Sequence, residues 1–183
     1  MKRTALLLLL AAAPASAHSG TGLPGGFAAG VLHPLTGPDH LLAMVAVGLW
    51  GAFLGRPLLY LLPIIFPLMM VVGAEIGMLD LPLPPVELGI AVSVLALGTA
   101  IASAWKAPIW LACPIVGLFA LFHGYAHGRE LPSAADPLGY AAGFVLATGS
   151  LHVAGIALGE LRMRSLGVGI AGAGLWFLIR AVA

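Results

Sequence analysis

Three side chains of types that bind metal ions lie within one short segment near the start of the chain. The segment His33-Pro-Leu-Thr-Gly-Pro-Asp39-His40 supplies two imidazoles and a carboxylate inside an apolar stretch long enough to cross a bilayer. Ionisable groups are costly in the bilayer core, so they mark a functional site by default. We therefore predict that His33, Asp39 and His40 are metal ligands.

A second group of such side chains lies much later in the chain. His123 and His127 are four residues apart, and Glu130 follows three residues later, so the three share one face of a helix. Gly124 and Gly128 beside the histidines would let a neighbouring helix approach closely. We predict that His123, His127 and Glu130 are metal ligands and that the two groups surround one ion.

Three more residues are further candidates for the metal site: His18, Glu75 and His152. A hydrogen-bonded bridge between helices explains His152 equally well, and a helix-end group or a proton site explains Glu75. Glu130, for its part, could simply pair with Arg129 at the membrane surface. His18 is a candidate because signal cleavage would expose its amine and imidazole together as a chelate, although a disordered terminus is the simpler expectation.

Composition defines the class of protein that must hold these residues. Of the 183 residues 61% are hydrophobic and 8% are charged, and the mean hydropathy is +1.07. This composition predicts an all-α integral membrane protein. A net charge of +1 argues against nucleic-acid binding, and the single Cys113 excludes a disulfide framework or a cysteine cluster.

The first 17 residues have the pattern of an export signal. Lys2 and Arg3 form a positive start, residues 6–13 an apolar core too short to span, and Ala15-Ser16-Ala17 a small-residue cleavage site. We expect a cleaved signal peptide over residues 1–17 and one transmembrane domain over residues 18–183. An uncleaved anchor is the alternative.

Six apolar runs follow, each near the ~20 residues that a bilayer requires. The first is too long for one straight span, and it contains Pro34, Gly37 and Pro38. We therefore predict that the first transmembrane helix is broken within residues 33–40. The predicted spans are 24–54, 58–78, 86–105, 108–128, 136–159 and 165–182.

Loop charges predict the orientation of these spans in a bacterial inner membrane. With both mature termini in the periplasm, Arg56, Lys106, Arg162 and Arg164 lie in cytoplasmic loops, as the positive-inside rule requires. This topology puts both ligand groups in the periplasmic half. The tryptophans lie near span ends and are predicted to be interfacial anchors: Trp50, Trp105, Trp110 and Trp176.

The predicted ligand types narrow the choice of ion. Imidazole with carboxylate suits borderline divalent metals such as nickel, cobalt, zinc or copper(II), whereas magnesium and calcium prefer oxygen cages. Spacing alone does not choose between nickel and cobalt. We expect no prosthetic group, so the metal is cargo.

The motifs resemble those of a known family. The pattern His-Pro-x-x-Gly-x-Asp-His, followed by Leu-Leu-Ala-Met-x-Ala-Val-Gly-Leu-Trp, and the later Phe-His-Gly-x-Ala-His-Gly-x-Glu resemble the HupE/UreJ family of hydrogenase and urease accessory membrane proteins. The resemblance covers essentially the whole chain and implies a secondary permease for nickel, in some members cobalt, that feeds metallocentre assembly. It implies metal-handling roles for these residues: His33, Asp39, His40, His123, His127 and Glu130. The first motif is also similar to the His-x4-Asp-His pattern of larger nickel/cobalt transporters, although five residues separate His33 from Asp39 here.

Other functions have less support in the sequence. It contains no Gly-x4-Gly-Lys-Ser/Thr loop, so we expect transport driven by a gradient or by a partner. A membrane enzyme is not expected, because no His-Glu-x-x-His string occurs and a di-iron site needs more histidines. A membrane-bound metal sensor or metallochaperone would use the same ligands without translocation and is the alternative. Hydrogenase or urease maturation proteins are the expected partners.

Overall fold

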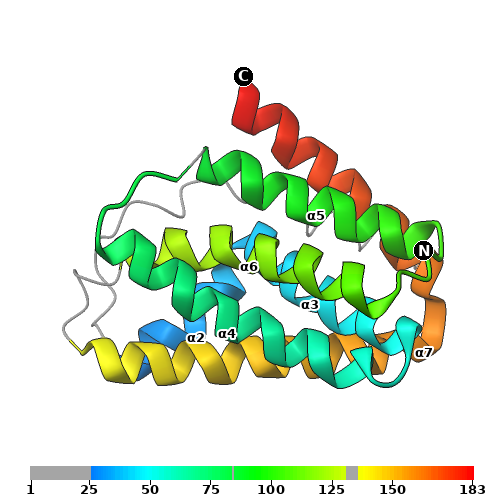
Figure 1. The fold of residues 1–183 in the computed structure, drawn as a ribbon, viewed down its shortest axis with the longest axis horizontal. Coiled ribbons are helices and arrows are strands. Elements are labelled where there is room, and N and C mark those ends of the chain that lie inside the picture. The colour runs from blue at the N-terminus through cyan, green and yellow to red at the C-terminus, as the bar shows by residue number, and fades with distance from the viewer. Residues whose placement is uncertain (1–25, 84, 131–135) are drawn as a thin grey trace, which may run out of the picture.

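The computed structural model describes residues 26–83, 85–130 and 136–183. Figure 1 shows a bundle in which most helices lie along one direction. The predicted signal peptide and His18 lie outside the described residues. All regular structure within those residues is helical: α2 (Phe27–Thr36), α3 (Pro38–Leu54), α4 (Leu58–Met78), α5 (Val86–Ala102), α6 (Ile109–Glu130) and α7 (Pro137–Val182).

Several of these helices are suited to a bilayer. Four segments of the described chain are long and apolar enough to cross it: Leu58–Met78, Ile109–Arg129, Pro137–Gly159 and Met163–Val182. The bent pair α2 and α3 makes a fifth if it is one span, and α5 is apolar but has only 17 residues. These are the helices of a multi-pass membrane protein, as the composition predicted. The count of six spans, the cleaved signal and the inner-membrane topology stay predictions.

The backbone turns sharply between α2 and α3, whose axes differ by 85°. Gly37 between them has an extended backbone, and Pro38 is the first residue of α3. A residue before proline disfavours the helical conformation, whereas proline itself fits the first turn of a helix. Pro34, by contrast, lies inside α2 without ending it. The turn therefore comes at Gly37, and a single broken span made of both helices stays a prediction.

The last two predicted spans belong to one helix, because α7 continues through residues 160–164. The sequence there is Glu-Leu-Arg-Met-Arg, which contains no glycine or proline and consists of good helix formers. The prediction of a loop at this point is therefore wrong. In Figure 1 the chain changes direction within the orange part of α7 while staying helical.

Glycines bring the backbones of these helices together. A Cβ atom on Gly124 of α6 would lie 2.1 Å from the Met70 carbonyl oxygen of α4, and one on Gly128 would lie 2.1 Å from that of Ala74. This confirms that Gly124 and Gly128 permit close helix approach. Gly155 similarly lets the first part of α7 approach α3, and Gly174 lets the last part approach α5.

Charged and aromatic residues gather at the two ends of the bundle. Trp50 stacks on Trp105, which brings the connection that contains Arg56 close to the one that contains Lys106. At the other end, Arg129 forms an ion pair with Asp80. Trp50 is fully buried, so its predicted role as an interfacial anchor is wrong: it packs in the core instead.

Candidate metal-binding site

Four histidines from three helices lie together inside the bundle. The ring centroid of His40 on α3 is 4.7 Å from that of His123 and 4.6 Å from that of His127, both on α6. The ring of His33 on α2 is 4.7 Å from that of His127. The rings of His40, His123 and His127 are buried. We call these four residues the histidine cluster, and the turn at Gly37 is what lets α2 and α3 both face α6.

Asp39 orients one member of the cluster. Its Oδ1 atom accepts the His40 backbone N–H and the His40 ring at Nδ1, each at 2.8 Å. An ionised carboxylate only accepts, so Nδ1 of His40 must hold the ring hydrogen of a neutral imidazole. Nε2 of His40 then presents its lone pair, and this buried atom has no hydrogen-bond partner in the described residues.

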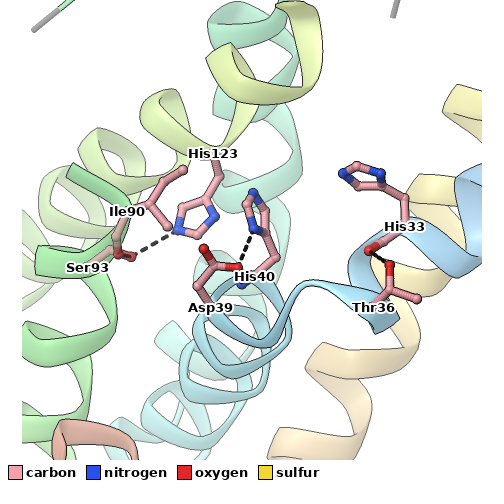
Figure 2. Close-up of polar contacts among 7 residues, drawn as sticks. All are labelled: His33, Thr36, Asp39, His40, Ile90, Ser93 and His123. Atoms are coloured by element: carbon pink, nitrogen blue, oxygen red, sulfur yellow. Dashed lines mark hydrogen bonds and ion pairs between the residues drawn. The ribbon is translucent and has the colours of Figure 1, made fainter. Parts of the chain in front are cut away.

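Ser93 of α5 contacts a second member of the cluster. Its Oγ lies 2.9 Å from Nε2 of His123, and this serine was not anticipated from the sequence. Figure 2 shows Ser93 on the opposite side of the His123 ring from His40. The other ring nitrogen, Nδ1, is buried and has no hydrogen-bond partner among the residues that the structure describes. Each of these two rings therefore has one engaged and one unengaged nitrogen.

The cluster does not form a finished coordination shell. No three His, Cys, Asp or Glu side chains of the described residues are arranged to hold one ion together. Oδ1 of Asp39 and Nε2 of His123 are engaged in hydrogen bonds within the protein. The residue types and their proximity fit a borderline divalent metal, and binding one would require the side chains to adjust around it.

Comparison with known proteins assigns the chain to a family. The model of the HupE / UreJ protein family matches residues 6–179. The chain belongs to this family. It is also 44% identical to Protein HupE of Rhizobium leguminosarum bv. viciae over 170 residues, which are 91% of this chain and 89% of that protein. No solved structure matches the chain.

The remaining predicted ligands of this HupE/UreJ family member lie apart from the cluster or beyond the description. Glu75 is exposed on α4. His152 of α7 is buried against Phe66, whose ring centroid is 5.4 Å from its own. The side chain of Glu130 lies outside the described part of the structure, as does His18. Of the predicted residues, the structure brings together those of the histidine cluster and Asp39.

Aromatic side chains that the sequence did not single out surround the cluster. Phe144 of α7 lies 4.3 Å from the ring of His127, and Tyr140 lies 5.9 Å from that of His33. Phe66 of α4 lies 5.6 Å from the ring of His123. Apolar residues occur throughout every span, so spacing offers no signal that would have identified these three. They surround the rings with apolar side chains, and a lower local dielectric strengthens electrostatic interactions within the cluster.

A pocket next to the cluster opens between α4 and α7. It has a volume of about 100 Å³ and is lined mainly by apolar side chains, with His127 and Thr148 among its few polar ones. Val71 and Val145 of its lining are exposed, so the pocket reaches the outer surface of the bundle. His127 is thus a cluster member that lines this pocket.

Proposed function

We propose that this protein is a secondary transporter that takes up nickel or cobalt across the inner membrane. The ion is captured from the periplasm by the histidine cluster together with Asp39, and Glu130 is proposed as a further ligand at the periplasmic end of α6. The metal is cargo for metalloenzyme assembly. Hydrogenase or urease maturation proteins are the proposed recipients, consistent with membership of the HupE / UreJ family.

The observation that supports this proposal best is the burial of the cluster. His123 is fully buried and His40 is 5% exposed, in helices that are otherwise apolar. Placing such side chains in a bilayer is costly, and the cost falls if a cation satisfies their free nitrogen lone pairs. A neutral imidazole is the form that binds metal, and the hydrogen bond from His40 to Asp39 leaves a ring nitrogen available for the ion.

The charge distribution supports the proposed orientation. In Figure 1 the α3–α4 and α5–α6 connections, which contain Arg56 and Lys106, lie at one end of the bundle, and the α4–α5 connection, which contains Asp80, lies at the other. Asp80 forms an ion pair with Arg129. With the first end in the cytoplasm, both mature termini are periplasmic and the cluster lies in the outer half of the membrane. Release toward the cytoplasm would then pass His152, which packs against Phe66 as His123 does.

Uptake into sealed proteoliposomes tests the proposal. Purified protein is reconstituted, and entry of nickel or cobalt chloride is followed with and without an imposed proton gradient. We expect saturable entry that is absent from empty vesicles and lost in His40→Ala and in His127→Ala, because each removes a buried ligand. Ser150→Ala is the matched control, since Ser150 is an exposed hydroxyl that donates to the Leu146 carbonyl of its own helix.

Three results are informative. Normal uptake by both histidine variants would refute the cluster as the ion site. Binding of metal without entry would instead favour the alternative, a membrane-bound sensor or metallochaperone that passes the ion to another protein. Entry lost in both variants, with intact protein in the membrane, would support a permease and rank its ions.

A further inference from the structure

We propose that Ser93 is a positioning residue that sets the tautomer of His123, so that Nδ1 of this ring, and not Nε2, binds the transported ion. The inference rests on the proposed function for the identity of the ligand. The assignment of the tautomer itself rests on the hydrogen bonds of the metal-free protein.

The tautomer follows from counting hydrogens at Ser93. The hydroxyl group has one hydrogen and is within hydrogen-bond distance of two atoms, the Ile90 carbonyl oxygen at 2.7 Å and Nε2 of His123 at 2.9 Å. A carbonyl oxygen only accepts, so the hydroxyl hydrogen goes to Ile90. The oxygen of Ser93 must then accept a hydrogen from Nε2 of His123. Figure 2 shows this chain of contacts from α5 to α6.

A neutral imidazole has one hydrogen, so Nδ1 of His123 is left with a free lone pair. That atom is buried and has no hydrogen-bond partner in the described parts of the chain. A buried acceptor without a partner destabilises the protein unless something satisfies it. The ring centroid of His40 lies only 4.7 Å away, and Nε2 of His40 is buried and equally unengaged. A cation bound by these two nitrogens satisfies both.

The two rings therefore form a complementary pair. Asp39 accepts a hydrogen bond from Nδ1 of His40 and leaves Nε2 for the ion. Ser93 accepts a hydrogen bond from Nε2 of His123 and leaves Nδ1 for the ion. A partner of this kind raises the basicity of a ligand imidazole and fixes the direction of its lone pair. The neutral hydroxyl of Ser93 does for one ring what the carboxylate of Asp39 does for the other.

A hydroxyl that merely stabilises its own helix would look different. Thr99, Ser103 and Ser150 each donate to carbonyls of their own helix, as serines in membrane helices commonly do. All three are exposed, whereas Ser93 is fully buried and has a side-chain contact on another helix. Ser150→Ala therefore removes the ordinary helix contact alone and is a matched control for Ser93→Ala.

The tautomer can be read without any metal. Full-length protein with ¹⁵N-labelled histidine is placed in lipid nanodiscs, and long-range ¹H–¹⁵N correlation spectra are recorded, with the His123 signals assigned by their loss in His123→Gln. We expect hydrogen on Nε2 in the wild-type protein and in Ser150→Ala, and a mixture of tautomers in Ser93→Ala. Hydrogen on Nδ1 in the wild-type protein would overturn the inference, even if Ser93→Ala failed to fold.

Titration with nickel chloride then tests the consequence. Loss of a residue that orients a metal-binding histidine typically weakens binding about 10- to 100-fold. We expect that loss in Ser93→Ala and unchanged affinity in Ser150→Ala. Equal affinity in wild type and Ser93→Ala refutes the role of Ser93 and leaves the transporter proposal intact. No binding by wild type refutes the proposed function, while the tautomer measurement still decides whether Ser93 orients His123.

Discussion

Phe66 packs against two buried histidines whose hydrogen bonding differs. Its ring centroid is 5.6 Å from that of His123 and 5.4 Å from that of His152. Nε2 of His123 is engaged by Ser93. Neither ring nitrogen of His152 has a hydrogen-bond partner in the described residues, although both are buried. One ring is therefore oriented by a polar partner and the other is held by packing alone.

This difference shows that burial alone does not identify a binding residue. A fixed partner fixes the tautomer, and the tautomer decides which nitrogen can meet a cation. His152 has no such partner, so either nitrogen can accept or donate and a passing ion meets no prepared site. Its backbone is held tightly instead, because a Cβ on Gly48 would lie 2.1 Å from the His152 carbonyl oxygen. The oriented ring of His123 suits capture of the ion, and His152 suits a transient contact during release.

The largest expected effect comes from separating α4 from α6, the helix that holds His123. In Gly124→Ala the new Cβ would lie 2.1 Å from the Met70 carbonyl oxygen, so α6 must move away from α4. Overpacking costs about 1–3 kcal/mol, and a clash with backbone belongs at the upper end of that range. Because His123 and His127 both lie on α6, we expect nickel binding to be lost as well. Thermal unfolding in detergent and calorimetric nickel titration measure both effects.

Gly149→Ala is the matched control for this substitution. A Cβ on Gly149 meets no atom within 4 Å, and alanine favours a helix more than glycine by up to about 1 kcal/mol. We expect unchanged binding and equal or slightly higher stability. If Gly124→Ala were as stable as Gly149→Ala, the close approach of α4 and α6 would not be what holds the cluster.

A smaller effect should follow from changing the partner of His40. In Asp39→Asn the carboxylate that fixes the Nδ1 hydrogen of His40 becomes a neutral amide, which can also donate. The fold should persist, and nickel affinity should fall about 10- to 100-fold, as for other residues that orient a metal-binding histidine. Nickel titration of the purified variant measures the loss.

Asp136→Asn provides the same chemical change where no ion binds. Asp136 caps α7 by accepting the backbone N–H of Gly139 at 2.9 Å, and asparagine caps helices about as well as aspartate. We expect this variant to match the wild-type protein in affinity and stability. Wild-type affinity in Asp39→Asn would mean that the orientation of His40 does not matter, and the contrast with His152 would lose its basis.

The sequence predicted the helices better than their interruptions. The run at 58–78 matches α4 because Pro57 precedes it and the apolar pattern ends before Asp80. The charged residues at 160–164 suggested a loop, yet they are good helix formers and α7 continues through them. Charged residues indicate where a chain meets water, whereas glycine and proline indicate where a helix ends. Residues 160–164 have the charges but no glycine or proline, so the helix continues through them.

Spacing along the chain identified the histidines but not their partners. His123 and His127 stand out because polar residues are rare in these spans and the four-residue spacing puts them on one face. Ser93 is one of two hydroxyl residues in α5, with Thr99, and nothing within α5 indicates which helix each of them faces. The sequence of α4 likewise does not indicate that Phe66 packs against His123 and His152. Which residues meet across helices depends on the packing of glycines such as Gly124, and that information is three-dimensional.

The smallest expected effect is that of replacing His152, the second histidine beside Phe66. In His152→Leu an apolar side chain replaces two buried nitrogens that have no hydrogen-bond partner among the described residues, so stability should be unchanged or higher by about 1 kcal/mol. Nickel affinity should stay at the wild-type value, while the maximal rate of uptake should fall if release passes His152. Thermal unfolding, nickel titration and proteoliposome uptake measure the three quantities.

His123→Leu makes the same substitution in the oriented ring and should abolish nickel binding, because it removes a ligand and leaves Ser93 without its side-chain partner. A loss of affinity in His152→Leu as large as that in Asp39→Asn would make His152 part of the capture site. The two rings beside Phe66 would then act together, and the absence of a polar partner would no longer distinguish a release contact from a binding one.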